Sequence, residues 1–272
     1  MRRGSLPVKR RAALALAVLC LAPSARAGDG RIEINQTCAV QTGCGPGDAA
    51  GFPVSTQASQ SYLLTSDLTL PSADSEGVRV AAGVTLDLGG FSIVGPTACT
   101  GSPAACTGTG NGDGILVLGG SVAIRNGRVA GAGRNGVYGS SFAGSLVEHV
   151  VAQSNGQHGF DLAGAGFQVL DCRAAGNGAD GFFGAYQGSG ANLYSGSLAR
   201  GNGDDGFDVS NAVLLDVTAF DNGDYGLFTS YANDRSAWGR AFLRNNNGGN
   251  ANPQAAGGTP LGTSVCGASA CP

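Results

Sequence analysis

Short apolar stretches, set off by asparagine and glycine, recur along this chain at a nearly constant interval. The recurring pattern is Asn-Gly-x-x-Gly followed by a large apolar residue, and it is clearest between residues 155 and 227. The glycines before the apolar residue are spaced by 22, 23, 22, 25 and 20 residues. These glycines are Gly114, Gly136, Gly159, Gly181, Gly206 and Gly226. A period near 22 is typical of a solenoid, in which each repeat stacks on the next.

A second apolar stretch lies between successive glycine anchors, as at residues 122–124, 146–147, 169–170 and 213–217. Alternation over a few residues between glycine turns predicts β-strands, and no window has the length and period of a helix. We therefore expect an all-β coil of parallel strands with successive turns about 4.8 Å apart. The repeats predict about seven or eight turns.

The period also predicts which side chains point inward. We call the six glycines before the apolar residue the anchor glycines. The position after each anchor glycine is apolar in every repeat. Two positions further on, the residue is small or apolar, because alternate residues of a strand point to the same side. The first column comprises Ile115, Val137, Phe160, Phe182, Phe207 and Leu227. The second column comprises Val117, Gly139, Leu162, Gly184, Val209 and Thr229.

The asparagines of the motif predict a buried column at a turn. They are Asn155, Asn177, Asn202 and Asn222. Stacked side-chain amides can satisfy one another and the backbone from turn to turn. We expect the glycine after each asparagine to adopt a positive φ. The motif thus has a complete structural explanation without any function.

These Asn-Gly-x-x-Gly-apolar repeats resemble those of right-handed parallel β-helix proteins of the pectin-lyase-like superfamily. Residues 61–68 and 84–93 resemble the opening turns of secreted bacterial members, and the ending with Cys266 and Cys271 is similar too. The resemblance covers about residues 60–265 and implies a right-handed parallel β-helix. It implies no single function, because the same coil carries lyases, hydrolases, epimerases and phage tailspikes.

The two ends of the chain differ from the repeats. Residues 1–27 have a basic start, an apolar core and an Ala-x-Ala exit, which predicts a secretory signal peptide and a secreted, extracellular or periplasmic protein. We expect an N-terminal cap with a disulfide loop at 28–59, the β-helix at 60–250 and a disulfide-pinned tail at 251–272. No apolar run is long enough to predict a transmembrane segment.

Seven cysteines follow the predicted signal peptide, and six of them form close pairs in glycine-, proline- and alanine-rich sequence. Local disulfides are expected in an oxidising compartment. Proximity predicts the bridges Cys38–Cys44, Cys99–Cys106 and Cys266–Cys271. The remaining Cys172 lies in an apolar run, so we expect a buried thiol.

The charge balance excludes one class of partner. Without the six basic residues of the predicted signal peptide, ten of 16 basic residues remain against 19 acidic ones, a net charge of −9. Lys9 is the only lysine, and it lies in the removed segment. A basic footprint for nucleic acid is therefore excluded.

Two further columns carry candidate chemistry, and both are predicted to point outward. The position before the anchor glycine holds Asp113, Asn135, His158, Asp180, Asp205 and Tyr225. Neighbouring members should stand about 5 Å apart, so an acid and a base could act together in proton abstraction beside a uronate carboxylate. The predicted catalytic residues are His158, Asp180, Asp205 and Tyr225. The alternative is that Asp, Asn and His are simply favoured in turns before glycine.

A calcium site is the second hypothesis for these acids, and the sequence indicates no other cofactor. Carboxylates this close attract a cation. The predicted ligands are Asp180, Asp204 and Asp205.

The second outward column lies two positions after the anchor glycine and interleaves aromatic and acidic residues. Sugar rings stack on aromatic faces while carboxylates bind their hydroxyl groups, so this column predicts contact with a polysaccharide or cell-surface glycan. The predicted contacts are Tyr138, Asp161, Phe183, Asp208 and Phe228. The alternative is that a loop or another subunit covers this face.

Comparison with known enzyme signatures leaves the function open. The Asp204-Asp205 and His158-Gly159 doublets occur in the opposite order to the paired-aspartate and His-Gly motifs of polygalacturonases, and both fit the repeat as turns. Pectate lyases combine calcium-binding acids with a basic residue, and no arginine column accompanies the acids here. The leading hypothesis is a secreted polysaccharide-binding β-helix. The alternatives are a lyase or epimerase acting on acidic glycans and a structural or adhesive solenoid.

Overall fold

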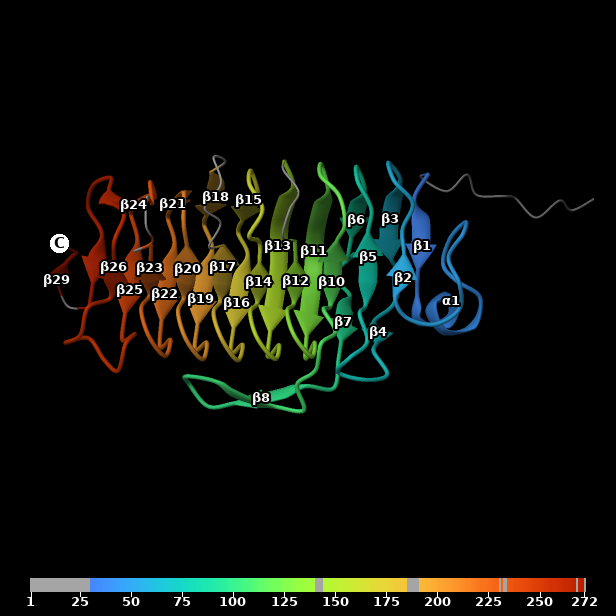
Figure 1. Cartoon of the computed structure of the whole chain (residues 1–272), viewed down its shortest axis with the longest axis horizontal. Helices are drawn as coiled ribbons and strands as arrows, with labels where there is room; N and C mark the ends of the chain where they lie inside the picture. Colours follow the sequence, from blue (N-terminus) through green and yellow to red (C-terminus); the bar gives the residue numbers. More distant parts are fainter. Residues whose placement is uncertain are drawn as a thin grey trace, which may run out of the picture. The chain divides into compact units, whose positions relative to one another are not determined.

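The computed structural model describes residues 30–139, 144–184, 191–229, 231, 234–267 and 269–271. The predicted signal peptide lies outside the described residues. Residues 31–272 form one compact unit, a parallel β-solenoid of about eight turns. Within this unit the strands succeed one another from α1 at one end to β29 at the other (Figure 1).

The solenoid has a nine-stranded and an eighteen-stranded sheet. The strands of the nine-stranded sheet are β2 (Val54–Ser55), β5 (Val78–Val80), β10 (Ile115–Val117), β12 (Val137–Tyr138), β14 (Phe160–Asp161), β17 (Phe182–Gly184), β20 (Phe207–Val209), β23 (Leu227–Phe228) and β26 (Ala255–Ala256). Each pairs in parallel with its neighbour, which is the arrangement that the repeat predicts.

The eighteen-stranded sheet has two arms, because most turns contribute two strands to it. The first arm contains β1 (Ile32–Ile34), β3 (Ser61–Leu64), β6 (Thr85–Asp87), β15 (Gln168–Leu170), β18 (Asn192–Ser195), β21 (Ala212–Leu215), β24 (Ala237–Gly239) and β27 (Thr259–Pro260). The second arm contains β4 (Leu68–Thr69), β7 (Ser92–Val94), β16 (Arg173–Ala175), β19 (Leu198–Arg200), β22 (Thr218–Phe220), β25 (Phe242–Arg244) and β28 (Val265–Cys266). The long strands β11 (Ala123–Ala130) and β13 (Leu146–Gln153) run through both arms, and β29 (Ser269–Ala270) pairs antiparallel with β28.

The register confirms the predicted inward column. Ile115 pairs with Val137, and the pairing continues through Phe160, Phe182 and Phe207 to Leu227. All these side chains are fully buried. The rings of Phe160, Phe182 and Phe207 stack nearly parallel, with successive centroids 4.9 and 4.6 Å apart. Burial of each ring contributes roughly 2–3 kcal/mol, and each stacked pair about 1 kcal/mol more.

The asparagine column is confirmed and extends further than predicted. Each asparagine donates its backbone N–H, at 3.0–3.1 Å, and its Nδ2–H, at 2.8–2.9 Å, to the Oδ1 atom of the next turn. The column continues to Asn246, whose N–H and Nδ2–H both reach Oε1 of Gln254. Gln254 therefore ends a ladder that begins at Asn155.

The prediction of a positive φ at the glycine after each asparagine is wrong. Gly156, Gly178, Gly203 and Gly223 do not adopt positive φ. A Cβ on any of them would stand well inside van der Waals contact of the carbonyl oxygen of the glycine one turn earlier. Close stacking of the turns, rather than backbone conformation, therefore requires glycine there.

The N-terminal segment contains one short helix, which the sequence pattern does not predict. Helix α1 (Gln36–Gln41) begins at the N-cap Asn35, whose side chain accepts a hydrogen bond from the N–H of Cys38. This segment was predicted as a cap, and its strand β1 also pairs with β3. No helix among the described residues is long and apolar enough to cross a membrane.

All three predicted disulfides are present: Cys38–Cys44, Cys99–Cys106 and Cys266–Cys271. Cys172 is a buried free cysteine, and burial raises the pKa of its thiol to about 12. The second bridge joins β8 (Ala98–Thr100) to β9 (Ala105–Thr107), an antiparallel hairpin inserted between β7 and β10. Figure 1 shows this hairpin lying along the turns that follow the second arm.

Candidate functional site

The predicted sugar-binding residues form one continuous column on the outer face of the nine-stranded sheet. Their register is set by the pairing of β12, β14, β17, β20 and β23. All five side chains are half-buried. We call this set the outer column; it comprises Tyr138, Asp161, Phe183, Asp208 and Phe228.

The residues before the anchor glycines form a second ladder beside the outer column. In all but the last member, Tyr225, the side chain accepts the backbone N–H of the counterpart one turn later. These bonds run from Asn135 to Asp113 at 3.1 Å, from His158 to Asn135 at 3.2 Å, from Asp180 to Nδ1 of His158 at 3.3 Å, from Asp205 to Asp180 at 2.9 Å and from Tyr225 to Asp205 at 2.6 Å. We call this set the turn ladder.

The prediction that the turn ladder points outward is wrong for most of its members. Asp113, Asn135, Asp180 and Asp205 are buried, with at most 7% of Asp205 exposed. His158 and Tyr225 are half-buried. The physical reason is the backbone: a turn N–H that is shielded from water needs an acceptor, and the side chain one turn earlier supplies it.

His158 joins the two columns. Its Nδ1 lies 3.0 Å from Oδ2 of Asp180, and its ring stacks on Phe183 of the outer column with centroids 4.7 Å apart. About 18% of the His158 side chain is exposed, so solvent reaches the imidazole but hardly reaches the carboxylate of Asp180. The structure thus brings a predicted catalytic pair into contact with a predicted sugar-binding ring.

The carboxylates here are strongly perturbed. Burial, followed by the charges of Asp180 and Asp204, raises the pKa of Asp205 to about 8. Burial likewise raises the pKa of Asp161 and of Asp208 to about 6 each. Asp205 therefore stays largely uncharged near neutral pH and can donate a proton, whereas Asp161 and Asp208 are mostly ionised there.

Two residues outside the predicted site contact the columns. Arg134 Nε lies 2.9 Å from Oδ1 of Asp113, and its guanidinium stands 4.6 Å from the ring centroid of Tyr138. Tyr231 donates its hydroxyl hydrogen to Oδ1 of Asp208 at 2.5 Å. Arg134 directly precedes Asn135 of the turn ladder, and this position in the repeat could have identified it from the sequence. Tyr231 lies outside the repeat, where the sequence carries no such signal.

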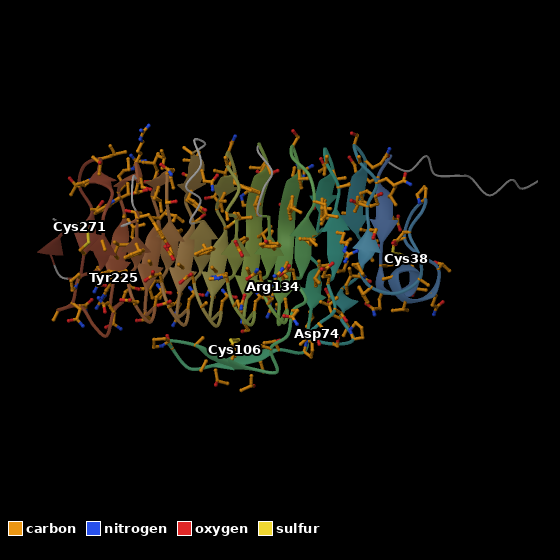
Figure 2. All side chains as sticks on the ribbon, in the orientation of Figure 1. Cys38, Asp74, Cys106, Arg134, Tyr225 and Cys271 are labelled. Carbon is orange, nitrogen blue, oxygen red and sulfur yellow. A yellow bond between two sulfur atoms is a disulfide. The ribbon has the colours of Figure 1, made fainter. Side chains whose placement is uncertain are left out.

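Arg134 and Tyr225 lie near the two ends of the turn ladder, several turns apart (Figure 2). No arginine column follows the acids, in agreement with the sequence; a single arginine reaches the first of them. Because Arg134 is paired with Asp113, its charge is largely compensated.

Three carboxylates could hold a cation next to the turn ladder. Ligand oxygens of Asp204, Asp205 and Asp224 all lie within 4.8 Å of one another. The predicted calcium set has Asp180 in place of Asp224; here Asp180 instead faces His158 and accepts the N–H of Asp205. Burial and the neighbouring charges of Asp180 and Asp224 raise the pKa of Asp204. Carboxylate oxygens suit calcium, and calcium binding at Asp180, Asp204 and Asp205 stays a prediction.

A family model described as the right handed beta helix region matches residues 113–255, which is more than half of the chain. The protein belongs to this family. The right-handed β-helix matched by the model contains both the outer column and the turn ladder. Among solved structures, the crystal structure of pectate lyase Pel9A is similar with a TM-score of 0.48 and 16% identity, over 79% of this chain and 69% of that one. No curated protein matches the sequence.

Proposed function

We propose that this right-handed β-helix protein binds a polysaccharide along its outer column. The observation that carries the proposal is the alternation of aromatic and carboxylic side chains on successive turns, in register and half-buried. Turns repeat at about 4.8 Å, close to the length of one sugar unit in an extended chain. Rings of Phe183 and Phe228 would stack on sugar faces, and Asp161 and Asp208 would accept bonds from hydroxyl groups.

The charge of this face favours an uncharged polysaccharide. Four carboxylic acids, at Asp161, Asp180, Asp205 and Asp208, lie on or beside the column, and the one arginine there is paired with Asp113. A polyuronate would meet charges of its own sign, and like charges at this distance repel. A neutral chain avoids this repulsion.

We also propose that the protein acts outside the cell. The predicted signal peptide and the three disulfides support this, since disulfides persist in oxidising compartments.

A catalytic role is the second candidate, and the raised pKa values favour it. An uncharged Asp205 or Asp208 could donate a proton to a sugar oxygen, while His158 could accept one. Under this candidate His158, Asp180, Asp205 and Tyr225 carry the reaction of a lyase or epimerase on an acidic glycan. Product formation from a polysaccharide, lost in both His158→Ala and Asp205→Asn, would distinguish an enzyme from a binding protein.

The binding proposal is tested with Phe183→Ala combined with Phe228→Ala. We expect the double variant to bind a neutral polysaccharide such as xyloglucan at least about tenfold more weakly, because two stacking contacts of roughly 1 kcal/mol each are lost. Isothermal titration calorimetry measures the affinity.

The matched control combines Phe91→Ala with Leu261→Ala, which removes two exposed apolar side chains away from the column. It should bind as the unaltered protein does. Unchanged binding in the Phe183/Phe228 variant would show that the outer column does not bind the polysaccharide. Absence of binding across neutral and acidic polysaccharides would favour the structural or adhesive class.

A further inference from the structure

A row of three hollows runs along the outer side of the second arm. Their volumes are about 280, 510 and 490 Å³. The first and second share Ser102 and Arg200 as lining residues, and the second and third share Asp221 and Asn245, so the row is continuous. We call it the arginine groove.

The walls of the groove carry no charge. One wall comes from the hairpin of β8 and β9, and the other from residues 245–250, Asn-Asn-Asn-Gly-Gly-Asn. The hairpin segment 96–110 contains no charged residue. It is held by the Cys99–Cys106 disulfide and by a 3.0 Å hydrogen bond from the N–H of Ala104 to the carbonyl of Gly201. Cys106, in the hairpin, lies below the turns in Figure 2. Such walls offer amide and peptide groups to sugar hydroxyls.

The floor of the groove presents an arginine, an aromatic ring and a second arginine on three successive turns. Arg200 of β19 pairs with Phe220 of β22, and Phe220 pairs with Arg244 of β25. The Arg200 guanidinium stands 5.1 Å from the centroid of Phe220. Arg173 lines the first hollow and adds a third cation.

The charge of the groove is positive, in contrast to the chain as a whole, whose net charge is −3. Asp221 is the one acid that lines it. Its Oδ2 lies 3.9 Å from Nε of Arg200, and its Oδ1 accepts a 2.7 Å bond from Nδ2 of Asn245. Within the described part of the chain, no carboxylate lies within 4.0 Å of the guanidinium of Arg173 or Arg244. Arg173 and Arg244 therefore have no carboxylate partner there, and the exposed guanidinium of Arg200 faces Asp221 only at the long distance of 3.9 Å.

We propose that the arginine groove binds an acidic polysaccharide that carries one anionic group per disaccharide. Arg200 and Arg244 are two turns apart, about 10 Å along the coil, so they match anionic groups on every second sugar. Guanidinium groups bind carboxylate or sulfate with paired hydrogen bonds. The uncharged sugar between them would contact the ring of Phe220, one face of which Arg200 covers. This inference does not depend on the outer column, which lies on the other sheet.

Three probes test the groove by calorimetry at low salt: hyaluronan fragments with one carboxylate per disaccharide, polygalacturonate fragments with one per sugar, and neutral dextran. We expect hyaluronan to bind best and dextran not to bind. Arg200→Ala combined with Arg244→Ala should weaken hyaluronan binding at least about tenfold, because two charge-assisted contacts are lost. Both side chains are exposed, and circular dichroism verifies that the variant keeps its fold.

The matched control combines Arg128→Ala with Arg240→Ala, which removes two exposed arginines outside the groove, one in β11 and one directly after β24. It should keep most of its affinity for hyaluronan. Unchanged binding in the Arg200/Arg244 variant, an equal loss in the control, or polygalacturonate bound as tightly as hyaluronan would each overturn the proposal. Phe183→Ala with Phe228→Ala should leave hyaluronan binding intact, which separates failure of the groove from failure of the outer column.

Discussion

Side-chain acceptors one turn away satisfy the backbone N–H groups at two positions in each turn. The asparagine ladder uses amide oxygens, which stay uncharged at every pH. The turn ladder uses Asp180, Asp205 and Nδ1 of His158 for the same purpose. An uncharged acceptor would suffice for structure, so the titratable groups of the turn ladder are where function is best sought.

The asparagine ladder should be costly to interrupt. Asn202→Ala removes the acceptor of both the N–H and the Nδ2–H of Asn177, which lie 3.1 and 2.9 Å from its Oδ1. We expect the free energy of unfolding to fall by roughly 3 kcal/mol, since buried donors left without partners cost about 1–3 kcal/mol each. Urea denaturation measures it. The exposed Asn111→Ala is the control, and an equally small effect in both variants would contradict a stabilising ladder.

The inserted hairpin is the element that turns a plain β-helix surface into a groove. It contacts the coil at several points: besides the bond of Ala104, the hydroxyl of Ser102 lies 3.4 Å from the carbonyl oxygen of Asp221, and the two bridge sulfurs lie 3.4 and 3.6 Å from the carbonyl oxygen of Asn155. The Cys99–Cys106 bridge holds its two strands together. The core beneath it is independent, because the Phe160, Phe182 and Phe207 stack lies inside the coil.

Loss of this disulfide should therefore affect the hairpin far more than the coil. We expect Cys99→Ser with Cys106→Ser to lower stability by at most about 2 kcal/mol, as for a short closed loop. Limited proteolysis should then cleave between residues 99 and 106, while the coil stays resistant. Cys266→Ser with Cys271→Ser is the control and should leave the hairpin resistant. A hairpin that resists protease without its bridge would show that the other contacts suffice.

Charge is unevenly distributed over the whole molecule. Carboxylates with raised pKa values gather along the nine-stranded sheet, whereas Arg173, Arg200 and Arg244 gather on the second arm. This distribution would let a single β-helix hold a neutral chain on one face and an acidic chain on another. It also makes stability depend on pH, because folding shifts the carboxylates toward their protonated form.

The sign of this dependence follows from the raised pKa values. In the folded protein the pKa of Asp205 is about 8, and those of Asp161 and Asp208 are about 6, against 3.8 for an unperturbed carboxyl. The folded state thus binds more protons above pH 4, and this contribution to stability is complete below pH 4 and lost as pH rises toward 8. We expect the melting temperature to fall from pH 5 to pH 8.

Asp205→Asn should flatten the part of this fall between pH 6 and pH 8, because an amide does not titrate. Differential scanning calorimetry at pH 5, 6.5 and 8 measures it. The exposed Asp171→Asn serves as the control and should keep the slope of the unaltered protein. A melting temperature that rises with pH, or an unchanged slope in Asp205→Asn, would contradict the assignment.

The repeat in the sequence was sufficient to predict the parallel coil, the inward Phe160, Phe182 and Phe207 stack and the asparagine column. It was sufficient because in a solenoid each residue contacts its counterpart one period away, so periodicity along the chain becomes contact in space. The disulfides were predictable for a similar reason, since each joins cysteines five to seven residues apart.

The tertiary structure alone decided how exposed the turn ladder is and what contacts it. Asp180 and Asp205 are buried because their carboxylates accept N–H groups from the next turn, which the sequence does not distinguish from a solvated turn. Tyr231 reaches Asp208 from an irregular segment, and the hairpin closes the groove beside Arg200 from an insertion. These segments do not repeat, so their positions depend on packing against the coil rather than on its period.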